Sequence, residues 1–195
     1  MTRHGTQSPD TRCDLPKLRR FAADQGGVSA VEFAILLPLM LTMYLGGVEV
    51  SQAVSADRKT TLVAHTVGDL TAQVTNVQTN DVTNIFNAGS AVATPFSSTN
   101  LSMTLTSVCI NGAGTAATVG WSQTQGGTAH SGTVTSSIPP ALMVANTSLI
   151  WGEANYNYRP TIGWTITGTL TLGDKFFLRP RLSCAVTLNG ASGCC

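Results

Sequence analysis

The sequence lacks the motifs on which most catalysis depends. None of its 195 residues forms a nucleophile elbow (G-x-S-x-G), a Walker A loop or a zinc-protease helix (H-E-x-x-H), and the part after residue 50 has no close pair of acids. No C-x-x-C occurs, and no metal-ligand spacing joins the cysteines to His65 or His130. We expect both histidines to be solvated surface residues. These absences predict a protein that is not an enzyme and has no metal, cofactor or small-molecule substrate.

Charge is also scarce, with 11 basic and 10 acidic residues, and it is unevenly placed. The segment 1–27 holds five basic and three acidic residues, and the remainder holds six basic and seven acidic. Neither part is basic enough to predict a nucleic-acid partner. The second part begins with Val28, and a sixteen-residue uncharged run, Phe33 to Val48, follows Glu32. Basic residues ahead of an apolar run predict a cytoplasmic leader and a domain on the far side of the membrane.

The apolar run predicts a transmembrane helix over residues 28–50. As a helix this segment spans about 34 Å, enough to cross a bilayer core of about 30 Å. Pro38 removes one helical hydrogen bond, which membrane helices tolerate. The alternative is a signal peptide that is cleaved after Ser55, where small residues follow the run. The long leader, and the acids Glu32 and Glu49 at the two ends of the run, favour a retained helix.

Beyond residue 50 the apolar pattern becomes one-sided and predicts an amphipathic continuation of the helix over 51–78. Its stripe recurs at spacings of three, four and seven: Ala56, Val63, Val67, Leu70, Val74 and Val77. We expect this stripe to pack on the chain's own downstream domain, with neighbouring subunits as the alternative. A shorter helix is predicted from Asp81 to about Ala91, with Asn80 or Thr79 as its cap and Pro95 after its end.

The remaining chain predicts strands. Alternating apolar residues indicate strands at 101–110 and 149–158, and a weaker one at 118–123. A last strand is predicted over about 175–188, where Pro180 confines part of it to an edge or a bulge. The fold class is therefore α+β: a long N-terminal helix followed by a small antiparallel sheet, in a domain over 79–188 with a cysteine-containing tail, 189–195.

Four of the five cysteines follow the membrane segment, and they are Cys109, Cys184, Cys194 and Cys195. Cys13 lies in the leader, where thiols stay reduced. An even number of cysteines in an oxidising compartment predicts two disulfides, with three pairings open. Adjacent Cα atoms lie only about 3.8 Å apart, so a bridge between the last two cysteines is disfavoured. We favour one terminal cysteine pairing with Cys109 and the other with Cys184; the alternative is two core thiols and a free or intermolecular terminal pair.

A short motif stands at the membrane boundary. Gly27 is followed by Val28 and, five residues after the glycine, by Glu32 and then Phe33. A carboxylate facing hydrocarbon is opposed by a few kcal/mol, about 2.5 to 3.5 at mid-membrane and less near the interface, so it indicates a partner or a purpose. The alternative without a partner is an unprocessed membrane anchor, in which Glu32 lies in the headgroup region and stabilises the helix N-terminus.

This arrangement resembles a prepilin leader, and four segments narrow the resemblance to the TadE/TadG-like proteins of tight-adherence (Flp-type) pilus systems. Two lie in the helix, at 30–34 (AVEFA) and 36–39 (LLPL), and two lie near the closing strands, at 155–160 (NYNYRP) and 176–181 (FFLRPR). The length fits the shorter TadE-like type, because TadG-like members carry a large additional domain. The tail 189–195 is not part of the recognised pattern.

The resemblance implies a single-pass pseudopilin or minor pilin of the bacterial inner membrane, with its C-terminal domain in the periplasm. A prepilin peptidase would cleave between Gly27 and Val28, and Glu32 and Phe33 would form an assembly contact. The new α-amino group, cationic at neutral pH, could neutralise Glu32 of its own or a neighbouring chain. The implied partners are other pilins and pseudopilins and the pilus assembly platform. The alternatives are an uncleaved anchored component of that machinery and a secreted, disulfide-stabilised binding domain.

Overall fold

The computed structural model describes residues 26–160, 168–191 and 194. Residues 1–25 of the predicted leader (1–27), Cys13 among them, and Cys195 lie outside the described residues. The chain divides into two units, Met1–Gly46 and Gly47–Cys195, and each is described by itself. A single helix, α2 (Gly26–Ala72), supplies the described part of the first unit and the first element of the second.

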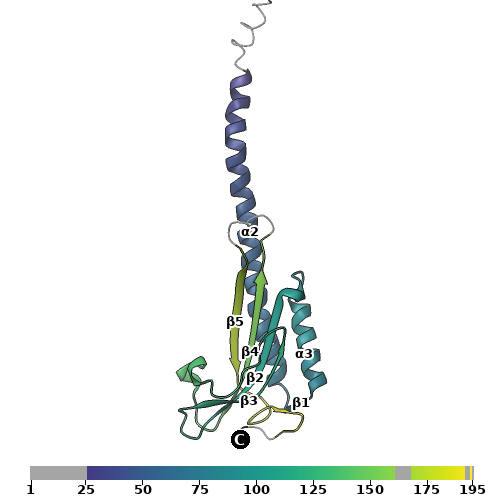
Figure 1. The fold of residues 1–195 in the computed structure, drawn as a ribbon, viewed down its shortest axis with the longest axis vertical. Coiled ribbons are helices and arrows are strands. Elements are labelled where there is room, and N and C mark those ends of the chain that lie inside the picture. The colour runs from purple at the N-terminus through teal and green to yellow at the C-terminus, as the bar shows by residue number, and fades with distance from the viewer. Residues whose placement is uncertain (1–25, 161–167, 192–193, 195) are drawn as a thin grey trace, which may run out of the picture. The chain divides into compact units, whose positions relative to one another are not determined.

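The second unit combines helices with a small antiparallel sheet, which confirms the predicted α+β class (Figure 1). Its four-stranded sheet has the order β3-β2-β4-β5, and every neighbouring pair is antiparallel. The strands are β2 (Leu101–Ile110), β3 (Ala117–Gln125), β4 (Ser148–Tyr158) and β5 (Leu170–Leu178). The other elements are α3 (Thr79–Val92), a two-stranded pair of β1 (Asn76–Val77) with β6 (Thr187–Leu188), and three short 3₁₀ turns, η1 (Ser98–Asn100), η2 (Thr135–Ser137) and η3 (Pro140–Leu142).

Strand β4 shows why two cores form. Side chains alternate along a strand, so Ile150, Ala154 and Tyr156 reach the core shared with the helices, while Leu149 and Trp151 reach a second core on the opposite face. The predicted alternation of this strand is confirmed. The central strand β2 is buried along almost its whole length, because both of its faces are covered.

The helical layer consists of α3 and the last turns of α2, which lie beside one another on one face of the sheet (Figure 1). The predicted stripe of α2 is buried at Ala56, Val63 and Val67. Small and hydroxyl-bearing residues extend the buried face beyond that stripe: Thr60, Ala64, Gly68, Thr71 and Ala72. A pattern that counts only apolar residues misses the threonines and the glycine, although small side chains allow the closest approach of a helix to a sheet.

The structure corrects two element boundaries. Helix α2 ends at Ala72 rather than near residue 78, and Val77, expected on the helical stripe, is buried as part of β1. Helix α3 is stabilised at its start by Asp81, whose side chain accepts a hydrogen bond from the backbone N–H of Gln78 at 2.9 Å, so the cap lies one residue before those predicted.

The predicted last strand over 175–188 is wrong in its extent. Strand β5 ends at Leu178, before Arg179 and Pro180, and only Thr187–Leu188 is extended again, as β6. Proline has no backbone N–H to donate, which explains why the ladder stops there. The segment after Pro180 instead crosses to the end of α2, where the backbone N–H of Arg181 donates to the carbonyl of Ala72 at 2.9 Å.

Candidate assembly site

The predicted motif lies in the first turns of α2. The helix begins at Gly26, and the side chains of Val28 and Phe33 are 56% and 61% exposed. A Cβ atom added at Gly27 would meet nothing within 4 Å. Packing among the described residues therefore gives no reason for a glycine at this position.

Glu32 is exposed on the same helix. Within residues 26–160, 168–191 and 194, it has no hydrogen bond or ion pair. Its carboxylate is thus not satisfied by the described part of its own chain. An acidic group at the edge of an apolar surface calls for a cationic partner from elsewhere.

The helix around this motif carries an apolar surface that the described residues do not cover. Among those residues, one helix, Gly27–Ala72, is long and apolar enough to cross a membrane, and none of its apolar window is buried. The core helix of a soluble protein would be mostly buried. Eleven large apolar side chains are exposed before Gly46: Val28, Val31, Phe33, Ile35, Leu36, Leu37, Leu39, Met40, Leu41, Met43 and Tyr44.

The four cysteines that follow the apolar run lie far from this motif in the sequence, in the second unit. Cys109 of β2 forms a disulfide with Cys194, their Cα atoms 5.1 Å apart, and Cys184 is also disulfide-bonded. The bridge closes a separation of 85 residues and ties the tail to the sheet. This tail had no assigned role in the sequence.

Hydrogen bonds hold the segment before Cys194 against β3, β1 and the start of α3. The indole N–H of Trp121 donates to the carbonyl of Val186 at 2.8 Å, and β6 pairs in parallel with β1. The side-chain oxygen of Asn189 accepts from the backbone N–H of Thr79, at the start of α3. Together with the ion pair between Arg181 and Asp69, these contacts make the C-terminal segment a clasp on the ends of both helices.

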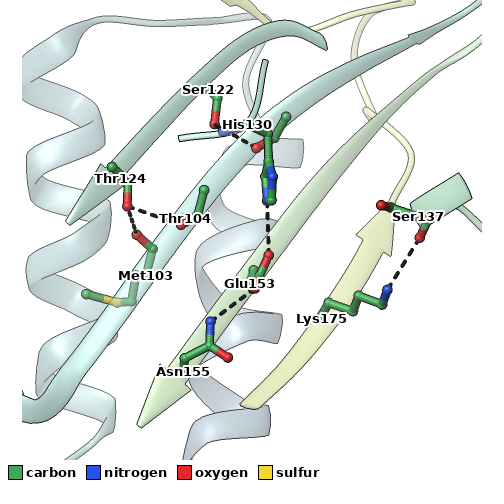
Figure 2. Close-up of polar contacts among 10 residues, drawn as sticks. Met103, Thr104, Ser122, Thr124, His130, Ser137, Glu153, Asn155 and Lys175 are labelled. Atoms are coloured by element: carbon green, nitrogen blue, oxygen red, sulfur yellow. Dashed lines mark hydrogen bonds and ion pairs between the residues drawn. The ribbon is translucent and has the colours of Figure 1, made fainter. Parts of the chain in front are cut away.

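His130 is more than a solvated surface residue. Its Nε2 lies 3.0 Å from Oε2 of Glu153 on β4, and its backbone N–H donates to the hydroxyl of Ser122 (Figure 2). Its ring stacks on Trp151, with centroids 4.1 Å apart. These contacts fasten the loop after β3 to the outer face of the sheet. They involve residues distant in sequence, so no local signal could have identified them.

His65 also has an aromatic neighbour, although it is exposed as expected. Its ring centroid lies 3.9 Å from that of Phe176 on β5. Among the described residues no group of three His, Cys, Asp or Glu side chains could hold a metal ion. The histidines serve the packing of the sheet.

The described residues thus combine one helix that is long and apolar enough to cross a membrane with an α+β unit that contains a small antiparallel sheet. The family model described as TadE-like protein matches residues 27–68, which span the motif and most of α2. This match confirms the resemblance recognised in the sequence. No curated protein and no solved structure matches the chain.

Proposed function

We propose that this protein is a non-enzymatic pseudopilin or minor pilin that takes part in assembling or initiating a tight-adherence pilus used for surface attachment. The TadE-like match suggests involvement in Tad pilus assembly in general. The single observation that supports the finer role is the motif itself: an unpaired Glu32 and a glycine that packing does not require, both at the edge of an uncovered apolar helix.

In this proposal a prepilin peptidase cuts between Gly27 and Val28 on the cytoplasmic side of the inner membrane. The apolar half of α2 then anchors the protein, with the second unit in the periplasm. The new α-amino group of Val28 is cationic and can neutralise the carboxylate of Glu32. If it belongs to an adjacent subunit, the pair sets the register in which helices associate, because each unpaired charge is destabilising in a low-dielectric bundle.

The side chain next to Glu32 supports the same contact. Phe33 is 61% exposed and lies on the apolar surface, where a ring adds area for packing against another pilin or pseudopilin helix. The proposed partners are therefore the peptidase, other pilins and pseudopilins, the assembly platform and the membrane itself.

N-terminal sequencing of the protein recovered from membranes tests the processing step. The expected mature start is Val28. A start at residue 1 or 2 would replace this proposal with an uncleaved anchor, and a start at Ala56 would replace it with a secreted domain. Replacing Gly27 with leucine should leave a longer, unprocessed band, whereas Gly26→Ala, a neighbouring change, should still be processed.

The assembly step needs a separate variant. Glu32→Gln keeps the size of the side chain and removes its charge. We expect this variant to be cleaved normally and to fail in pilus assembly, measured as pilus protein sheared from the cell surface. Normal piliation by both Gly27→Leu and Glu32→Gln would show that the motif has no such role.

A further inference from the structure

The second unit contains an open pocket of about 510 Å³ directly after the apolar run. It is lined by one helix face and one turn: Ser51, Gln52, Ser55 and Lys59 from α2, and Pro95 and Phe96 after α3. We propose that this pocket binds the phosphate headgroup of an anionic phospholipid from the leaflet at the end of the membrane span. The inference requires only that α2 anchors the protein in a membrane, and it does not depend on the proposed pilus role.

The polar wall of the pocket is formed by one face of α2 and carries one cation, Lys59. Ser51, Ser55 and Lys59 are spaced by four residues, so they lie on one face of α2. Lys59 is half-buried, and its ammonium group has no ion pair or hydrogen bond within the described part of the chain. A partly desolvated cation gains most from an anionic acceptor, and hydrogen bonds between an ammonium and a phosphate are among the strong ones.

The hydroxyl and amide groups complete this wall. The hydroxyl of Ser55 donates to the carbonyl of Ser51 at 2.9 Å, which leaves its oxygen as an acceptor only. The side chains of Ser51 and Gln52 have no hydrogen bond to the described residues, so both can donate to a ligand. The wall therefore offers three donors, including Lys59, and no carboxylate.

The position of the pocket along the helix matches the headgroup layer. Val50, the last residue of the predicted span, is 65% exposed and directly precedes Ser51. At a rise of about 1.5 Å per residue, Lys59 starts about 14 Å beyond Val50. Long helical side chains lean toward the helix N-terminus, so a lysine at this position is expected to extend its ammonium toward the headgroup layer.

The opposite wall supplies an apolar surface for the glycerol and upper acyl region. Pro95 is exposed, and Phe96 is half-buried against Tyr156, with ring centroids 5.9 Å apart in an edge-on arrangement. An anionic lipid such as phosphatidylglycerol is preferred over phosphatidylcholine, because a choline group would place a second cation beside Lys59.

Native mass spectrometry of the full chain in non-ionic detergent tests this proposal. The probes are short-chain phosphatidylglycerol, short-chain phosphatidylcholine and inorganic phosphate. We expect one phosphatidylglycerol to bind at least about fivefold more tightly than phosphatidylcholine, and Lys59→Gln to weaken that binding about tenfold, as expected for the loss of one charge-assisted hydrogen bond. Inorganic phosphate at the same concentration should not displace the lipid.

Two further variants make the outcome decisive. Arg58→Gln removes the same charge one residue away, at a position that does not line the pocket, and should bind lipid like the unmodified protein. Ser55→Leu leaves the charge unchanged but narrows the pocket, and should also weaken binding. Equal losses in Arg58→Gln and Lys59→Gln would overturn the proposal in favour of non-specific charge attraction. Displacement of the lipid by inorganic phosphate would overturn it in favour of a free-phosphate site.

Discussion

Gly152 of β4 lies directly against the backbone of α2 at Gly68. A Cβ atom added to Gly152 would lie 2.5 Å from the carbonyl oxygen of Ala64 and 3.1 Å from the backbone nitrogen of Gly68. A Cβ atom at Gly68 would in turn lie 3.0 Å from a methyl group of Leu178. The helix and the sheet therefore approach as closely as they do because both contact positions lack a side chain.

This contact predicts that Gly152→Ala destabilises the second unit. The added methyl group meets rigid backbone atoms rather than a movable side chain, so we expect a loss of about 3 kcal/mol, the upper end of the range for overpacking. Denaturant unfolding of the protein in detergent measures the loss. Gly112→Ala is the matched control, because the nearest atom there is the side-chain oxygen of Asn146 at 3.2 Å, which can move. Equal stability of both variants would contradict the close contact.

The disulfide between Cys109 and Cys194 predicts that removing either cysteine lowers the stability of the second unit. Serine at either position should lower the free energy of unfolding by about 3–5 kcal/mol, since closing a loop of this length removes much of the entropy of the unfolded chain. Thermal unfolding with and without reductant measures it. Cys13→Ser, in the leader, should have no effect. If reductant shifted the melting temperature of the Cys109→Ser variant as much as that of the unmodified protein, the bridge would contribute nothing.

The contacts of His130 with Glu153 and Trp151 predict a moderate loss of stability when this histidine is replaced. His130→Ala removes the hydrogen bond to Glu153 and the stacking on Trp151, which together should lower stability by about 1–2 kcal/mol. Near-ultraviolet circular dichroism should change as well, because Trp151 loses its stacked neighbour. His65→Ala is the control: it removes one exposed ring contact, with Phe176, and should cost only about 0.5 kcal/mol. A larger loss in the control would contradict this ranking.

Tyr158 predicts a pH dependence. Burial, the negative charge of Glu49 and the neighbouring Tyr156 raise the pKa of the Tyr158 hydroxyl above its ordinary value of 10.0. The folded state thus keeps this proton to higher pH than the unfolded state does. The resulting stability is present below about pH 10 and is lost as the pH rises through the folded-state pKa.

Tyr158→Phe should therefore retain its stability better above pH 10 than the unmodified protein does. Glu49→Gln should move the pKa of Tyr158 back toward its ordinary value, which a titration of tyrosinate absorbance in the near ultraviolet would detect. An unchanged titration in this variant would show that Glu49 does not act on Tyr158.

Local patterns predicted a large part of the fold. The alternation around Trp151 and the apolar periodicity of α2 each depend on neighbours in the sequence; the first is confirmed, and the second is confirmed from Ala56 to Val67. The predicted last strand is too long, because we expected Pro180 to lie at an edge or a bulge within it. In the structure the strand ends at Leu178, before the proline. The cap at Gln78 was missed because glutamine is a weak capping residue, and the hydrogen bond to Asp81 compensates for it.

The candidate assembly motif was visible in the sequence for the same reason. Gly27 and Glu32 are five residues apart, and their meaning depends on their position before an apolar run, which composition alone reveals. The hydrogen bond between His130 and Glu153 could not be predicted. The loop that carries His130 has no periodic signal, and Glu153 belongs to a strand that is distant in the sequence.

The sequence by itself determined a long apolar helix with one carboxylate near its start and an α+β domain after it, because helical and strand periods and membrane length are local properties. Only the tertiary structure decided which glycines let α2 rest on β4, that the tail is tied to the sheet through Cys109 and Cys194, and that Lys59 shares a pocket with Phe96. Those features depend on close packing between segments far apart in the chain, where distances of a few tenths of an ångström decide which side chains fit.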